Sequence, residues 1–141
     1  MNSVKAGILI SISLCIGVAL PVWGDFSRGQ EAYLLKDYAR AIQEYKNDDS
    51  PKANYQIGYM YDHGEGVPQN GKEAAAWYLK AAEKGHVRAQ YRLGLMYASG
   101  FGVDQDMKEA VKWYRKAAGQ GFLPAKEALK KIEKNQIDKN K

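Results

Sequence analysis

An internal repeat with a period of 36 residues restricts the fold of this chain more than any other feature. Eighteen residues between positions 53 and 85 recur with the same identity 36 positions later. Among them are Ala53, Gly58, Met60, Tyr61, Gly64, Gly66, Val67, Gln69, Ala74, Trp77, Tyr78, Lys80, Ala81, Ala82 and Gly85. A period of about 20 to 50 residues is typical of solenoids, in which each unit buries its apolar side only against its neighbours. Because solenoids usually bind other molecules along an extended surface, the repeat favours a binding protein over an enzyme.

The first repeat predicts two short helices separated by a glycine-rich loop. Apolar residues recur at helical spacing over residues 52–63 and again over residues 71–84. The intervening Gly-Glu-Gly-Val-Pro stretch cannot continue a helix, and Gly64 suits the left-handed position that ends the first one. Asn70 is the predicted N-cap of the second helix, with Glu73 three residues later completing a variant of the capping box.

The second repeat predicts the same pair of helices over residues 88–99 and 106–118. Its loop lacks the proline of the first repeat. Either Asp104 or Asp106 can supply the N-cap of its second helix, and the sequence does not choose between them.

Weaker copies of the unit flank the two repeats. Upstream, Gly29, Ala32 and Tyr33 indicate a first helix, and a second follows the Asp37-Tyr38 turn. The predicted organisation is a signal peptide (1–24), a degenerate tetratricopeptide-like unit (25–50), two full repeats (51–86 and 87–122), a capping helix (123–135) and a disordered tail (136–141). We therefore predict an all-α fold, a short right-handed α-solenoid of about seven helices in antiparallel pairs.

The first 24 residues have the order of a secretory signal peptide. Lys5 is followed by an uncharged, mostly apolar stretch over residues 6–24 and then by Asp25. This order predicts cleavage after Gly24, and an uncleaved membrane anchor is the alternative, because the stretch is nearly long enough to span a bilayer. Since Lys5 should stay inside, both alternatives place the rest of the chain across the membrane, in the periplasm or outside the cell.

The mature chain offers no cysteine chemistry and no strong overall charge. Cys15 is the only cysteine and leaves with the signal peptide, so no disulfide, thiolate nucleophile or cysteine metal site remains. Residues 126–141 carry six lysines against three acidic residues. This tail indicates either contact with an anionic membrane or polymer, or simply a solvated helix end. No interleaving of aromatic and basic residues typical of single-stranded nucleic-acid binding is found, so we expect no nucleic-acid partner.

Three segments of the repeats resemble the Sel-1-like repeat, a relative of the tetratricopeptide repeat with a longer loop between its helices. They are Leu-Gly-Leu-Met-Tyr (93–97), Gly-Glu-Gly-Val-Pro-Gln (64–69) and Ala-x-x-Trp-Tyr-x-Lys-Ala-Ala-x-x-Gly (74–85). The resemblance covers residues 52–122 closely, whereas residues 25–45 look more like a plain tetratricopeptide hairpin. It implies the solenoid fold and a general role as an adaptor or scaffold in protein complexes.

Most of the repeated residues have a structural interpretation. Trp77 and Trp113 are predicted to pack between helices, because large amphipathic rings of this kind usually belong to the core. Gly58 and Gly94 fall in the middle of predicted helices, where glycine costs about 1 kcal/mol relative to alanine. A close approach by the neighbouring helix would explain both glycines, so Gly→Val at either position is expected to destabilise the fold.

The resemblance also indicates a binding surface, because the first helix of each pair lines the concave face of tetratricopeptide-like arcs. The positions that this implies are Lys52, Tyr55, Tyr59, Asp62, Arg88, Tyr91 and Leu95. Tyrosine is favoured at interfaces, and the two cations can pair with acidic groups or with the C-terminal carboxylate of a peptide. The alternative is that the tyrosines only cover the neighbouring helix.

Residues that carry catalytic or metal chemistry are sparse. His63 at a helix end and His86 in the turn between the repeats are the only histidines. His63 with the nearby Asp62 and Glu65 would make only a thin metal site, so an exposed histidine at a helix end is the favoured interpretation. No nucleophile elbow, Ser-x-x-Lys or phosphate-binding loop is present in the sequence. We therefore predict no catalytic residue, no cofactor and no metal.

The sequence thus predicts an exported, non-enzymatic adaptor that binds a protein or peptide, in a bacterial periplasm or outside the cell. The bacterial source is inferred from the signal peptide and from the style of the repeats. An envelope hydrolase or a peptidoglycan-binding protein of the same repeat family is the alternative. Self-association through the ends of the arc is a third possibility, and contact with a membrane is expected only if the N-terminal segment is not cleaved.

Overall fold

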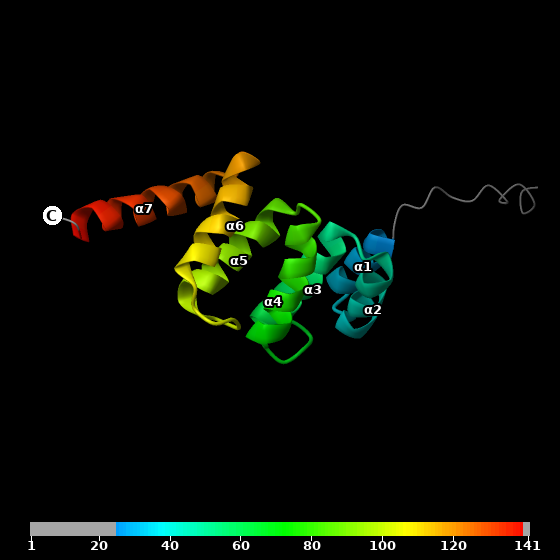
Figure 1. Cartoon of the computed structure of the whole chain (residues 1–141). Coiled ribbons are helices and arrows are strands. Elements are labelled where there is room, and N and C mark those ends of the chain that lie inside the picture. The colour runs from blue at the N-terminus through cyan, green and yellow to red at the C-terminus, as the bar shows by residue number, and fades with distance from the viewer. Residues whose placement is uncertain (1–24, 140–141) are drawn as a thin grey trace, which may run out of the picture.

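The structure, a computed structural model, describes residues 25–139 as seven helices without a strand in that range. The helices are α1 (Asp25–Leu34), α2 (Tyr38–Asp48), α3 (Pro51–His63), α4 (Gly71–Glu83), α5 (Val87–Ser99), α6 (Met107–Gly119) and α7 (Leu123–Lys139). Figure 1 shows the helix pairs following one another along the molecule, which confirms the predicted all-α solenoid. The predicted signal peptide or anchor, residues 1–24, lies outside the described residues.

The second helices of both repeats begin at predicted caps. The side-chain oxygen of Asn70 accepts hydrogen bonds from the backbone N–H groups of Lys72 and Glu73, at 3.0 and 3.2 Å. Asp106 caps α6 in the same way, so Asp106 starts that helix and Asp104 stays in the loop. Such caps satisfy the N–H groups that the first turn of a helix leaves without a backbone partner.

The predicted breaks around the first unit are also confirmed. Asp37 caps α2 by accepting a hydrogen bond from the N–H group of Arg40 at 3.2 Å. Asp49 then ends α2 with a left-handed backbone (φ 47°). Ser50 caps α3, and Pro51 occupies its first turn, where a missing N–H group costs nothing.

In three helix pairs, the first helix (α1, α3 or α5) has a glycine against which a tyrosine ring of the second helix (α2, α4 or α6) packs. The pairs are Gly29 with Tyr45, Gly58 with Tyr78 and Gly94 with Tyr114. A Cβ atom at these glycines would lie only 2.4, 2.6 and 2.4 Å from the nearest ring carbon. The close approach predicted for the two repeats is therefore confirmed, and the degenerate first unit shares it.

The two equivalent tryptophans differ in burial. Trp113 is only 5% exposed and packs into the core cluster formed mainly by α4 and α5. Trp77 packs against the cluster of the first unit and remains half-buried. In both cases a lysine one turn later places its Nζ atom 4.1 Å from the ring centroid, Lys80 over Trp77 and Lys116 over Trp113.

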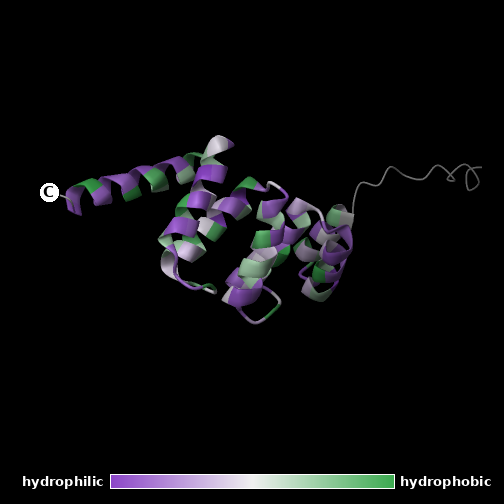
Figure 2. Cartoon of the chain, viewed as in Figure 1, coloured by the Kyte–Doolittle hydropathy of each residue, from purple (hydrophilic) through white to green (hydrophobic). Residues whose placement is uncertain are grey.

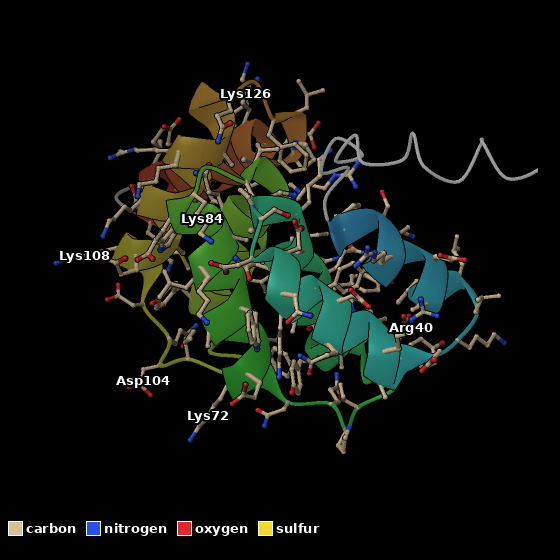
Figure 3. All side chains as sticks on the ribbon, turned by 90° about the vertical axis from the view of Figure 1, so that its right-hand side faces the viewer. Arg40, Lys72, Lys84, Asp104, Lys108 and Lys126 are labelled. Atoms are coloured by element: carbon tan, nitrogen blue, oxygen red, sulfur yellow. The ribbon has the colours of Figure 1, made fainter. Side chains whose placement is uncertain are left out.

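Polar contacts between units recur with the same period. Lys84 at the end of α4 (labelled in Figure 3) donates to the backbone carbonyl of Asp49 and forms an ion pair of 2.9 Å with its carboxylate. The hydrogen bond from Lys84 lowers the pKa of the Asp49 carboxyl. At the equivalent positions Gln120 donates to the carbonyl of Gly85 at 3.0 Å and to the side chain of buried Gln90 at 2.8 Å. Each unit is thus tied to the preceding turn.

The glycine-rich loops also contact the preceding unit. Gly64 ends α3 in the predicted left-handed conformation, with its N–H group bonded to the carbonyl of Met60. In the second repeat, a Cβ atom at Gly102 would lie 2.2 Å from the backbone of Gly71, at the start of the preceding second helix. Only glycine permits that approach, because φ is also positive at Gly102.

The last helix corrects one sequence prediction. The sequence indicated a helix ending near residue 135 and a disordered tail over 136–141, but α7 continues to Lys139. Neither glycine nor proline interrupts residues 125–139, and the exposed Asn135 is tolerated inside a helix that is otherwise rich in lysine, glutamate and isoleucine. Figure 2 shows hydrophilic and apolar residues alternating along this helix. No helix within residues 25–139 is both long and apolar enough to cross a membrane.

Candidate protein-binding groove

A hollow of about 290 Å³ lies beside the N-terminal ends of α3 and α5. It is lined by side chains from α1, α3 and α5 and from the turn that precedes α5. The lining residues are Phe26, Lys52, Tyr55, Gln56, His86, Val87 and Arg88. Three predicted groove residues, Lys52, Tyr55 and Arg88, therefore meet at one site, which we call the cationic hollow.

Aromatic rings form one wall of the cationic hollow. The ring of Tyr55 stacks on that of His86, with centroids 4.6 Å apart and planes inclined by 23°. Tyr55 also contacts Tyr78, the ring that packs on Gly58, at a centroid distance of 5.5 Å. The hollow thus has a fixed apolar surface, because Tyr55 is held on two sides.

Sequence reasoning missed Phe26, although a repeat signal for it exists. Phe26 stands three residues before Gly29, as Tyr55 stands three residues before Gly58. Its ring lies 5.5 Å from that of Tyr45, which matches the distance between Tyr55 and Tyr78. The shorter spacing of the first unit concealed this correspondence.

The charges at the cationic hollow are positive. Lys52 and Arg88 are exposed, and they come from the first turns of α3 and α5. Burial lowers the pKa of His86, and the nearby cations Arg88 and Lys52 lower it further. The first turns of helices carry partial positive charge, so the site attracts anions.

His86 makes stability depend on pH. Its Nδ1 atom caps α5 by accepting a hydrogen bond from the N–H group of Ala89 at 3.3 Å, which requires that nitrogen to be unprotonated. Because its folded pKa lies below the ordinary value of 6.5, the unfolded chain binds the proton more tightly. We expect neutral His86 to make its full contribution to the free energy of unfolding above about pH 6.5. This contribution should decrease as the pH drops through the folded pKa.

Urea denaturation between pH 8 and pH 5 checks this prediction. His86→Asn keeps a cap acceptor but does not titrate, so it should flatten the pH dependence in this range. His63→Asn, which removes the other histidine, is the comparison variant. An equal slope in the parent and in His86→Asn would contradict the assignment.

Asp62, another predicted groove residue, is occupied by contacts within the fold. Its carboxylate accepts a hydrogen bond from the Tyr78 hydroxyl at 3.0 Å and lies 3.9 Å from both Arg92 and His63. Burial, followed by the negative charge of Asp62, raises the pKa of Tyr78. Asp62 therefore positions Tyr78 and Arg92 and is a weak candidate for direct contact with a ligand.

The remaining predicted residues lie along the same first helices. Tyr59 stacks on His63 at 3.9 Å between centroids, and Leu95, its equivalent in α5, is 37% exposed. Tyr91 contacts both Tyr114 and Phe122, at 5.7 and 5.3 Å. Tyr55 and Tyr91 are thus only partly exposed, because each also packs on the second helix of its pair. Truncating either side chain would therefore change both the helix packing and the groove surface.

A metal site requires several ligating side chains close together. Within residues 25–139, no group of three or more His, Cys, Asp or Glu side chains is arranged to hold a metal ion. The cationic hollow contains two cations, one histidine and apolar rings, a composition suited to binding.

Comparisons with known proteins support a relationship to repeat proteins from bacteria and yeast. The solved structure of a Sel1 repeat protein from Oxalobacter formigenes is 44% identical, with a TM-score of 0.68 over 73% of this chain and 44% of that one. A protective antigen of uropathogenic Escherichia coli with an SLR fold is 33% identical, with a TM-score of 0.66 over 72% of this chain and 23% of the other. Cysteine-rich protein B of Helicobacter pylori is 26% identical, with a TM-score of 0.61 over 64% and 70% of the two chains.

A curated relative and a family model address the repeats directly. The chitin synthase regulator SKT5 of Saccharomyces cerevisiae is 42% identical over 57 residues, which are 38% of this chain and 8% of that protein. This chain thus spans only a small part of the yeast protein and less than half of the first two solved structures. The Sel1 repeat model matches residues 51–86 and 87–122, the two repeats found by self-similarity. The chain therefore belongs to the Sel1 repeat family.

Proposed function

We propose that this protein is an exported adaptor that binds a protein or peptide along its first helices, with the cationic hollow as the anchoring point. Sel1 repeat proteins are generally scaffolds for protein–protein interaction and are typically not enzymes, which supports an adaptor. The observation that carries the proposal is the convergence of two exposed cations and two aromatic rings from three different first helices.

The composition of the cationic hollow suggests the chemistry of its ligand. Lys52 and Arg88 can pair with a carboxylate, either an acidic side chain or the C-terminus of a peptide. Tyr55 and Phe26 offer apolar area for a neighbouring side chain of that ligand. We therefore infer a peptide segment that carries a carboxylate next to an apolar residue.

Export is the second part of the proposal. It is supported by the basic, apolar and small-residue order of residues 1–24. In bacterial cells that express the full chain, the protein should appear in the envelope fraction. A mature mass starting at Asp25 indicates cleavage, and the full-length mass indicates a retained anchor.

Reversing the charge of the hollow is expected to abolish anchoring without changing the fold. Lys52→Glu/Arg88→Glu should weaken binding at least about tenfold, because two favourable charge contacts become repulsive. Both side chains are exposed, so helical circular dichroism and the unfolding midpoint should stay close to the parent values. Lys72→Glu/Lys108→Glu, at two exposed lysines on the second helices, changes net charge equally and is the control.

A panel of peptides with apolar residues near free or amidated C-termini is the probe, and binding is followed by fluorescence anisotropy. Preference for free over amidated ends, lost only in Lys52→Glu/Arg88→Glu, supports recognition of a terminal carboxylate. Preference for internal acidic residues, lost in the same variant, supports recognition of an acidic side chain. Equal binding by the hollow variant and by the control variant would rule out the cationic hollow.

A further inference from the structure

Helix α7 is the only first helix in the described part of the chain without a second helix packed on it. In the preceding units α2, α4 and α6 cover α1, α3 and α5, whereas α7 packs mainly on α6 and has no second helix after it in the described residues. Figure 1 shows α7 extending away from the other helices. One side of α7 is therefore open at the position that a second helix occupies in the other units.

The repeat register identifies the residues on that open side. Ala125 follows Ala89 by 36 residues, and both are fully buried, which fixes the alignment of α7 with α5. Lys126, Lys130 and Lys134 then correspond to Gln90, Gly94 and Ala98 of α5, and to Asn54, Gly58 and Asp62 of α3. In α3 and α5 these positions are buried or half-buried. In α7 all three are exposed lysines, spaced four residues apart along one side of the helix.

This lysine seam, Lys126, Lys130 and Lys134, does not suit another helix of the same repeat. Lys130 replaces the glycine that receives a tyrosine ring in each of the other units. A second helix of the usual kind would bring its ring against a long charged side chain. The seam instead favours a helix whose facing residues are acidic, with Leu129, half-buried beside the seam, as an apolar contact.

Charge is strongly segregated toward this end of the molecule. Residues 107–139 carry nine Lys and Arg against four Asp and Glu, whereas residues 25–106 carry ten against twelve. Lys126 lies at the outer edge of the molecule, as the view in Figure 3 shows. This distribution guides an acidic partner toward the end of the molecule that carries α7.

We propose that the lysine seam of α7 binds an amphipathic helix of a partner protein, in the position of a second helix, through acidic residues spaced four apart. A helix is favoured over a bilayer because α7 has no continuous exposed apolar stripe for insertion: Leu129 and Ile132 are half-buried against the cluster around Tyr114, and the exposed Leu123 and Ile137 lie near opposite ends of the helix. The surface is separate from the cationic hollow, so this inference does not depend on the proposed groove.

A designed peptide tests the inference on the full-length chain. The probe is an alanine-rich helix of 17 residues, the length of α7, with three glutamates four apart beside a leucine stripe. Its control has the same composition with the glutamates spread around the helix. At an ionic strength of about 0.15 M, where the screening length is about 8 Å, the patterned peptide should bind at least about tenfold more tightly than its control.

Paired variants locate the contact. Lys126→Glu/Lys130→Glu should weaken binding of the patterned peptide at least about tenfold, and a peptide with lysines in place of its glutamates should restore binding to that variant. Lys131→Glu/Lys139→Glu changes the charge of the same helix equally but lies off the seam, so it should change the affinity by less than about threefold. The restored binding also shows that the seam variant is folded.

Three outcomes would overturn the inference. Equal affinity for the two peptides, or equal loss in the two variants, would mean that the lysines act only as a diffuse cationic surface. Absence of binding at high micromolar peptide would mean that the seam is a solvated helix end. Retention on phosphatidylglycerol vesicles that is lost in the seam variant, without binding of the patterned peptide, would assign the surface to an anionic membrane.

Discussion

Trp113→Ala is expected to lower the free energy of unfolding by about 3–5 kcal/mol, the largest loss among the substitutions considered. The indole is 5% exposed and lies in the cluster that joins α4, α5 and α6. Its Nε1 atom is buried without a hydrogen-bond partner within the described residues, so the loss comes from packing and from the cavity left behind. A single domain of this size is stable by only about 5–15 kcal/mol, so this loss is a large share of the total.

Trp77→Ala is the matched comparison because Trp77 stands at the equivalent position one repeat earlier. It is half-buried, so we expect a smaller loss of about 1–3 kcal/mol. Urea denaturation followed by far-ultraviolet circular dichroism measures both, since fluorescence would change with the tryptophans themselves. Equal losses would show that the exposure of Trp77 in the structure does not reflect its contribution to packing.

Gly94→Ala is expected to destabilise the fold by about 1–3 kcal/mol even though alanine is the better helix former. The new Cβ atom would lie 2.4 Å from Cε1 of Tyr114, which is 3% exposed and also contacts Tyr91. The ring cannot move without displacing its neighbours, so α5 and α6 must separate. Gly94→Val should cost more than Gly94→Ala, because its side chain adds two further methyl groups at the same contact.

Gly119→Ala provides the control for backbone effects. Gly119 lies at the end of α6, and a Cβ atom there would meet nothing within 4 Å. This variant should be neutral or more stable by up to about 1 kcal/mol. A stabilised Gly94→Ala variant, or a double variant Gly94→Ala/Tyr114→Leu that loses the full sum of the two single changes, would contradict the close-approach argument.

Local chemistry explains why the helices were predictable from the sequence. Asn70 and Asp106 place the N-termini of α4 and α6 through hydrogen bonds to residues two and three positions away. Gly64 ends α3 through its own backbone conformation. Because these signals act within a single turn of helix, the pattern of residues is sufficient to position them.

The binding surface was less predictable. The sequence indicated Lys52, Tyr55 and Arg88, which meet at the cationic hollow, but it did not indicate Phe26 or His86. Phe26 belongs to a unit that departs from the 36-residue spacing. His86 lies in the turn before α5, and its ring stacks on that of Tyr55. The shape of a hollow between three helices depends on how the units are spaced and oriented in the fold. The 36-residue period of the sequence does not give these distances.

The end of α7 was predicted too early along the chain. The tail over residues 136–141 was predicted from its polar composition, which favours disorder and an exposed helix equally well. The helix extends to Lys139 because its lysines, glutamates and isoleucines are adequate helix formers and no breaker intervenes. Composition alone therefore underestimated the length of the surface that carries the lysine seam.

The sequence by itself determined the helices, their pairing and the family, because each unit of a solenoid contacts only its neighbours and the repeat records those contacts. The tertiary structure alone decided that Asp62 is held by Tyr78 and Arg92, and that Trp77 is more exposed than Trp113. It also decided that three lysines of α7 occupy an uncovered seam. The physical reason is that burial and charge pairing depend on what lies across the interface between units, and equivalent residues in a repeat do not meet equivalent neighbours at the ends of the array.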